Sequence, residues 1–360
     1  MPPSLLCVPR FGLCALMLVT GCASIGPKTI PRDRFDYSAS ISESWKRQTL
    51  LNIVKLRYLD PPIFVDVGQI VAGYSFETLL TGSTSFPETD SFGGRTVGAG
   101  ASARYTDRPT ITYTPMTGNK FVKGLMTPIP PDSIFFAIQS GWPADSVMYS
   151  GVASINGLKN QASTIAGVTP PDPGFLRSIQ LLRSIQDSGA VSMRVRQDAQ
   201  KQQSTMIALR SMDISEKTKA ESRELRQLLK LDPDASEFRL VFGATATDNK
   251  EIAVLPRSLL HILSTMAVQV DVPPEDITAG RTMAGLPPGP EGDAMRLTHI
   301  HSGKKLSPDA FVSVYYRNRW FWIDDRDLRA KRAFAFMMYM FTMADTGEKE
   351  PLPLITIPAQ

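Results

Sequence analysis

Two histidines, His299 and His301, have a spacing that could support metal chemistry. Residues 297–301 are predicted to form a strand, and residues two apart on a strand share a face. Both imidazoles could therefore contact one Zn²⁺ ion, but such a site needs at least three protein ligands. The only other histidine, His261, falls in a predicted helix. No Asp or Glu has a sequence spacing that would place its carboxylate beside the histidine pair. We interpret the pair as solvent-facing and predict no metal or other cofactor, although the sequence leaves metal binding by this pair open.

Carboxylates are concentrated in Asp324-Asp325-Arg326-Asp327, which could supply paired catalytic acids or bind a cation. This segment lies between a predicted hairpin at 315–323 and a predicted helix at 327–345. Aspartate at such a position accepts hydrogen bonds from the free N–H groups of the first helical turn and favours the positive end of the helix dipole. We therefore predict helix capping instead of catalysis, followed by a core helix rich in Phe and Met.

One further segment matches a known motif in residue pattern but not in predicted secondary structure. Residues 98–103 read G-x-G-x-x-A, the fingerprint of dinucleotide-binding proteins, but that motif requires a helix to begin there. The alternation of a strand runs through the match instead. No G-x-S-x-G, H-E-x-x-H or P-loop pattern occurs in the sequence. The sequence therefore marks no catalytic residue, and we do not favour an enzyme.

Cys22 has the most informative chemical context in the chain. Arg10 supplies a positive charge, residues 11–19 form an unbroken apolar stretch, and Val19-Thr20-Gly21-Cys22 follows at once. This order is typical of an export signal. The last four residues resemble the lipobox of bacterial lipoproteins. In that motif, small residues before the cysteine let the signal peptidase reach the scissile bond, and the cysteine thiol accepts a diacylglycerol group. The resemblance implies that residues 1–21 are removed and that Cys22 carries the S-diacylglycerol and N-palmitoyl groups.

The other cysteines agree with this interpretation. Cys7 and Cys14 would leave with the signal peptide, so Cys22 would be the only thiol of the mature chain. In lipoproteins of this class, Asp after the cysteine tends to retain the protein in the inner membrane, whereas Ala23 and Ser24 follow here. The resemblance therefore implies a lipid-anchored protein of a Gram-negative outer membrane that faces the periplasm. Its expected partners are the membrane, through the anchor, and other envelope proteins.

The charge balance argues against a nucleic-acid partner. The 360 residues include 39 Lys and Arg against 35 Asp and Glu, a net charge of +4, with no concentrated basic stripe. Binding to a phosphate backbone requires such a stripe. Beyond the signal peptide, no apolar run reaches the about 18 residues of a membrane-spanning helix.

The mature chain mixes helical and strand patterns without regular alternation, which predicts an α+β fold with small antiparallel sheets. A helical pattern begins near Ser42 and is stopped by Asp60-Pro61-Pro62. Residues 80–118 are rich in Gly, Ser and Thr and are predicted to contain a β-hairpin. Further helices are predicted at 132–140, 144–158, 175–188, 216–231 and 257–268, and further strands at 63–74, 190–196, 238–242, 251–255, 310–314 and 352–357. The predicted organisation is a signal peptide (1–21), a lipidated polar tether (22–40), a helical region with the inserted hairpin (41–235) and an α+β region (236–360).

Residues 97–114 have a pattern typical of outer-membrane strands. Small apolar and small polar residues alternate from Val97 to Thr106, and Arg108-Pro109 is predicted to turn the chain into a returning strand at 110–114. In some ring-forming outer-membrane lipoproteins, each subunit lends a hairpin of this kind to a shared sheet. Ala and Gly are weakly lipophilic, however, and an ordinary exposed hairpin or flap fits the same pattern.

Two segments, Leu-Asn-Ile-Val-Lys-Leu-Arg-Tyr at 51–58 and Phe-Trp-Ile-Asp-Asp-Arg-Asp-Leu at 321–328, resemble parts of uncharacterised bacterial lipoproteins. That resemblance implies no activity. Because no catalytic constellation is marked, we expect a non-enzymatic binding or scaffolding subunit. Two alternatives stay open: a subunit of a ring-forming outer-membrane export channel that contributes the 97–114 hairpin, and a hydrolase of envelope material with an unmarked site.

Overall fold

The computed structural model describes residues 25–344, except 72, 86–95, 165–166, 198–202, 210–213, 287–288, 290–291 and 293–295. The fold is α+β with mostly antiparallel sheets, which confirms the predicted class. The chain divides into two compact units, the first made of Met1–Glu43 and Val65–Thr114 and the second of Ser44–Phe64 and Pro115–Gln360. Within the described residues, none of the helices is both long enough and apolar enough to span a bilayer.

The first described helix is longer than predicted. Helix α2 (Ile25–Arg57) includes residues 25–40 of the segment expected to form a polar tether and thus extends well before Ser42. Pro31 lies inside the helix, where it removes one backbone hydrogen bond. The helix ends ahead of Asp60-Pro61-Pro62, as predicted, and Leu59 adopts a positive φ of 60° just beyond it.

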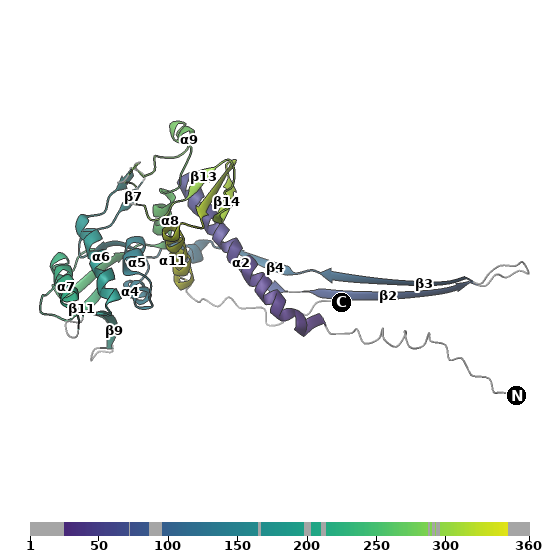
Figure 1. Cartoon of the computed structure of the whole chain (residues 1–360), viewed down its shortest axis with the longest axis horizontal. Coiled ribbons are helices and arrows are strands. Elements are labelled where there is room, and N and C mark those ends of the chain that lie inside the picture. The colour runs from purple at the N-terminus through teal and green to yellow at the C-terminus, as the bar shows by residue number, and fades with distance from the viewer. Residues whose placement is uncertain are drawn as a thin grey trace, which may run out of the picture. The chain divides into compact units, whose positions relative to one another are not determined.

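The first unit contains a long two-stranded sheet (Figure 1). β2 (Tyr74–Ser85) pairs antiparallel with β3 (Thr96–Asp107), from Tyr74 opposite Asp107 to Ser85 opposite Thr96. β1 (Val65–Val71) pairs with β4 (Thr110–Pro115) in a second small sheet. The predicted pairing within 97–114 is therefore wrong. Arg108 donates its N–H to the carbonyl of Gly73 at 2.9 Å, so Arg108-Pro109 joins two strands that have different partners and does not form a hairpin turn.

The second unit is built on a six-stranded sheet. Its strands are, in spatial order, β6 (Leu158–Lys159), β5 (Val152–Ile155), β12 (Glu251–Pro256), β11 (Glu237–Phe242), β10 (Gln203–Leu209) and β9 (Val191–Gln197). β11 and β12 run parallel, and the other pairs are antiparallel. The sheet thus combines strands from both sides of residue 235, where the sequence suggested a boundary.

Helices cover this sheet where the sequence predicts them, with one exception. They are α4 (Pro131–Gln139), α5 (Ala144–Gly151), α6 (Pro173–Asp187) and α7 (Glu216–Leu228). The helix predicted at 144–158 is too long, because the chain enters β5 at Val152. Asn156 and Gly157 then take positive φ values of 43° and 86°, the conformation of a two-residue hairpin turn between β5 and β6.

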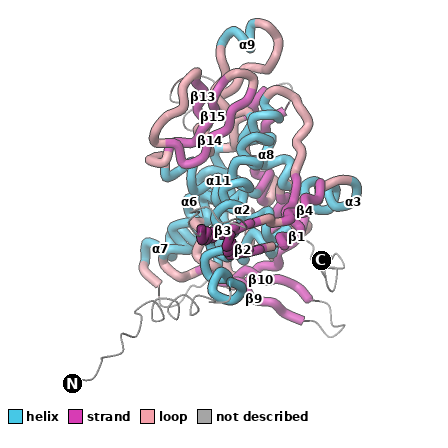
Figure 2. The backbone as a smooth tube through the Cα atoms, turned by 90° about the vertical axis from the view of Figure 1, so that its right-hand side faces the viewer, coloured by secondary structure: helices cyan, strands magenta, loops and turns pink. Residues whose placement is uncertain are grey.

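The C-terminal part adds a three-stranded sheet in the order β13 (His301–Gly303), β15 (Arg319–Asp324), β14 (Ala310–Tyr316), seen in Figure 2. Arg317 and Asn318, with φ values of 47° and 60°, form the tight turn between β14 and β15. Helix α11 (Leu328–Ala344) buries Phe334, Phe336 and Met337, as expected of a core helix. The strand predicted at 352–357 lies outside the described residues. The remaining elements are α3 (Gly118–Phe121), η2 (Val122–Met126), β7 (Ala162–Thr164), β8 (Gly167–Thr169), α8 (Leu259–Ala267) and α9 (Pro274–Thr278).

Candidate functional site

The paired strands β2 and β3, hereafter the long hairpin, separate apolar from polar side chains. Alternation along each strand and the register between them place successive residues on opposite faces. The described side chains of the first face are Tyr74, Thr78, Leu80, Gly82, Ala99, Ala101, Ala103 and Tyr105, and those of the second are Ser75, Glu77, Leu79, Thr81, Ser83, Gly98, Gly100, Ser102, Arg104 and Thr106. The first face is thus mainly apolar, and the second is polar except for Leu79.

Both faces of the long hairpin are exposed. Leu79 is 62% exposed on the polar face, while Leu80 and Tyr105 are 82% and 52% exposed on the apolar face. Within the described residues, β2 and β3 form a sheet of only two strands, so each has an edge of backbone N–H and C=O groups outside the ladder. An isolated two-stranded hairpin is marginally stable in water. A long apolar face and two free edges are features of a surface that binds something.

The base of the long hairpin is fixed by aromatic and charged side chains. The rings of Tyr74 and Tyr105 stack with centroids 6.3 Å apart. The Tyr74 hydroxyl donates a hydrogen bond of 2.6 Å to Asp33 of α2 in the same unit. This bond, together with burial, raises the pKa of Tyr74 above its usual range. On the polar face, Glu77 lies directly opposite Arg104, a favourable cross-strand pair.

Cys22, the predicted lipid-attachment residue, lies outside the described residues. Residues 98–103 lie inside β3 and not at a helix N-terminus, which agrees with their interpretation as strand. The predicted cap is confirmed, because the carboxylate of Asp327 accepts the N–H of Ala330 at 2.9 Å in the first turn of α11. Asp324 in turn accepts the N–H of Arg326 at 2.9 Å.

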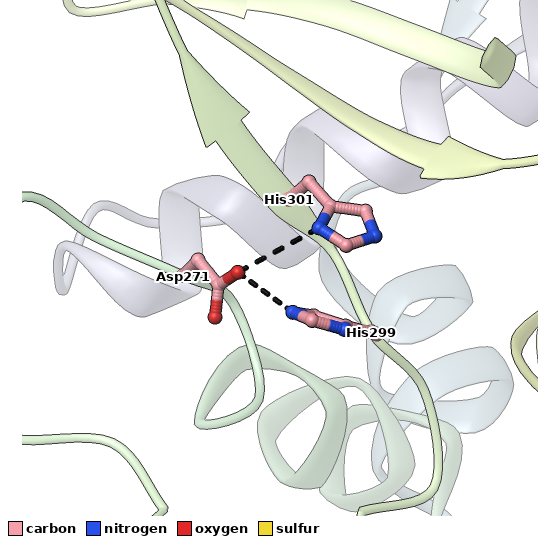
Figure 3. A group of neighbouring side chains, drawn as sticks. All are labelled: Asp271, His299 and His301. Carbon is pink, nitrogen blue, oxygen red and sulfur yellow. Dashed lines mark hydrogen bonds and ion pairs between the residues drawn. The ribbon is translucent and has the colours of Figure 1, made fainter. Parts of the chain in front are cut away.

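The two histidines singled out in the sequence lie beside a carboxylate that the sequence did not suggest (Figure 3). His299 Nε2 is 2.7 Å from Asp271 Oδ2, and His301 Nδ1 is 3.8 Å from the same oxygen. The imidazole centroids are 3.8 Å apart. His261, on α8, is not part of this cluster. No local motif relates Asp271 to the histidines, since 28 residues separate it from His299.

Comparisons with models of known protein families, with curated proteins and with solved structures each found no match for this chain. The proposals below therefore depend on the residues and their geometry.

Proposed function

We propose that this protein is a lipid-anchored subunit of the outer membrane that assembles with copies of itself through the long hairpin. The paired hairpins form a closed sheet that lines a water-filled pore, as in an export channel. The observation that carries this proposal is the separation of apolar from polar side chains on a hairpin that is exposed on both faces. The hairpin is β2 with β3, which replaces the 97–114 segment expected from the sequence.

Free edges favour another copy of the same hairpin as the partner. A neighbouring strand satisfies the N–H and C=O groups along β2 and β3, and closing the ring leaves no edge unpaired. Copies related by rotation keep apolar face beside apolar face and polar face beside polar face. The additional strands also supply the stability that a two-stranded sheet lacks.

Strand length and side-chain chemistry support insertion into a bilayer. Each strand has 12 residues, and a tilted transmembrane strand needs about 9–11. Leu80 and Tyr105 would contact lipid, while Glu77, Arg104 and the Ser and Thr side chains would face water. The alanine-rich part of the lipid face gains little free energy in hydrocarbon, so assembly depends mainly on backbone pairing between copies.

The predicted anchor suits this role. Lipid chains on Cys22 would add about 0.8 kcal/mol of membrane affinity for each buried methylene, and several chains together give stable attachment. Anchored copies share one surface, which raises their effective concentration for pairing. Mass spectrometry of the mature N-terminus tests the anchor. An unmodified N-terminus that is the same in wild type and Cys22→Ser would contradict it.

Two neighbouring substitutions test the pore. Ala101→Lys places a charge on the apolar face and Ser102→Lys on the polar face, and both positions are exposed, so neither variant should change the fold. A lysine that faces lipid at mid-membrane raises the free energy of insertion by about 2–4 kcal/mol, and this penalty applies to every copy in the ring. We expect Ala101→Lys to abolish rings in detergent extracts and conductance in planar bilayers. Ser102→Lys should form rings whose conductance shifts towards anions.

A monomer in detergent for the wild-type protein, or the same behaviour of both lysine variants, would contradict the pore. A monomer would favour the other non-enzymatic expectation, a binding or scaffolding subunit. The described residues provide no observation that favours the hydrolase alternative.

A further inference from the structure

We propose that Asp271, His299 and His301 form a binding site for a divalent transition-metal ion of the Zn²⁺ type. This proposal is independent of the long hairpin, because it rests on side chains of the second unit alone. It also goes beyond the sequence pattern, which supplied two ligands and lacked the third.

The backbone brings the three residues together. Val270 and Ile300 form an isolated parallel bridge, and the N–H of Asp271 donates to the carbonyl of Ile300 at 2.8 Å. Ile300 is fully buried, with its side chain in the core. Because side chains alternate along an extended chain, His299 and His301 both project to the opposite side, where Asp271 lies. The positions of all three ligands therefore depend on one buried residue and one backbone contact.

The distances fit a tetrahedral ion after small side-chain rotations. One ligand atom from each residue lies within 4.8 Å of the others, and the two pairs that include Asp271 Oδ2 measure 2.7 Å and 3.8 Å. With metal–ligand bonds of about 2.0–2.1 Å, ligand atoms in a tetrahedral site lie about 3.3 Å apart. The observed separations lie on both sides of that value. Rotation about side-chain bonds is thus sufficient, and the backbone can stay in place.

The donor set determines the class of metal. Two imidazole nitrogens and one carboxylate oxygen suit Zn²⁺ and its first-row neighbours, whereas Ca²⁺ and Mg²⁺ prefer oxygen ligands. The side chains of His299, His301 and Asp271 are 33%, 30% and 42% exposed, so solvent reaches the cluster. Three protein ligands with solvent access describe an open site, in which water or a small ligand completes the coordination.

Neighbouring side chains hold the ligands in place. The ring of His301 stacks on Trp322 with centroids 5.6 Å apart, which limits its rotation. The guanidinium of Arg296 lies 3.8 Å from Asp271 Oδ1, the oxygen that does not contact the histidines. Such outer contacts orient ligands and tune metal affinity.

Metal titration of the full-length protein tests the site. Because the chain has only three histidines, His261→Asn is a matched control for His299→Asn and His301→Asn, and Asp271→Asn removes the carboxylate charge with little change in shape. The protein is purified without a polyhistidine tag, treated with chelator, and titrated with Zn²⁺ by calorimetry. Co²⁺ is the spectroscopic probe, because its visible absorption reports the coordination geometry.

We expect one ion per chain in the wild type and in His261→Asn. Each of the three ligand variants should bind more than about 100-fold more weakly, because losing a ligand costs more than losing an outer-shell partner, which costs about 10–100-fold. Thermal unfolding without metal checks that the variants are folded. The proposal is overturned if the folded wild type binds neither ion stoichiometrically, or if the folded ligand variants bind as tightly as His261→Asn.

Discussion

Asn52 forms two hydrogen bonds with one residue, Ile63. Its Nδ2 donates to the carbonyl of Ile63 at 2.7 Å, and its Oδ1 accepts the N–H of Ile63 at 3.0 Å. Asn52 is buried on α2, and Ile63 follows the two prolines that terminate this helix. One amide side chain thus satisfies both backbone groups of a residue in a segment that has no regular secondary structure.

Replacing Asn52 with Leu should lower the free energy of unfolding by about 1–3 kcal/mol, since it removes two hydrogen bonds that contribute about 0.5–1.5 kcal/mol each. Urea unfolding followed by circular dichroism measures the change. Ser44→Leu, at an exposed position of the same helix, is the control and should change stability by less than about 0.5 kcal/mol. Equal stability of the two variants would show that the amide is not needed.

Arg257 is buried and serves three backbone carbonyls, those of Tyr149, Ser150 and Gln161. Burial lowers the pKa of its guanidinium to about 10. Lysine keeps the charge but not the planar set of donors. Arg257→Lys should therefore cost about 3 kcal/mol in urea unfolding. Arg223→Lys on the exposed side of α7 is the control and should leave the free energy of unfolding almost unchanged. An equal change for both substitutions would refute a role for the planar donor set of Arg257.

The half-buried imidazole of His261 should make stability depend on pH. Burial, with a smaller contribution from Arg257, lowers its pKa to about 4 from the unfolded value of about 6.5. Between these values the unfolded chain binds the proton more readily, so this stabilisation is complete above pH 6.5 and is lost as the pH falls towards 4. Allowing for partial exposure of the ring, we expect about 1–2 kcal/mol.

Urea unfolding of the wild type and of His261→Gln at pH 7 and pH 4.5 measures the pH-dependent contribution of His261 to the free energy of unfolding. All other titratable groups are the same in both proteins, so the difference between them isolates His261. A wild-type protein that loses no more stability than the variant would disprove the assignment.

The cap of α11 gives a fourth prediction. Asp327→Ala removes the side-chain acceptor of the Ala330 N–H and should destabilise the protein by about 1 kcal/mol. Asp325→Ala is the matched control, because Asp325 makes an exposed ion pair with Lys331, and such pairs contribute little. Thermal unfolding compares the two, and an equal shift in Tm would show that Asp327 acts only by its charge.

Local patterns predicted much of the fold. The amphipathic period of α6, the charged face of α7 and the Arg317-Asn318 turn are encoded within a few residues, and the structure has them where the sequence places them. β2 was missed as a separate strand because Ser, Thr and Gly, which fill its second half, favour turns as much as strands. The sequence pattern therefore pairs β3 with the nearest strand-like segment, β4, instead of with β2.

The metal cluster could not be predicted for a different reason. His299 and His301 were recognisable by their spacing, but Asp271 reaches them only through the contact between Val270 and Ile300. Such a contact between distant segments depends on how the whole unit packs. No periodicity near Asp271 marks it, and the positions on either side of the histidine pair carry Thr298 and Ser302 instead of a carboxylate.

The small residues of β3 have a consequence for how the long hairpin can vary in length. Residues 98–103 read Gly-Ala-Gly-Ala-Ser-Ala, so a shift of two positions puts nearly identical side chains on the same faces. The distinctive partners, Tyr74 with Tyr105 and Glu77 opposite Arg104, all lie near the base. Alignment is thus specified at the base and not along the middle. Related chains could gain or lose two residues in each strand without exchanging the faces, and in the proposed pore such changes would match the hairpin to membranes of different thickness.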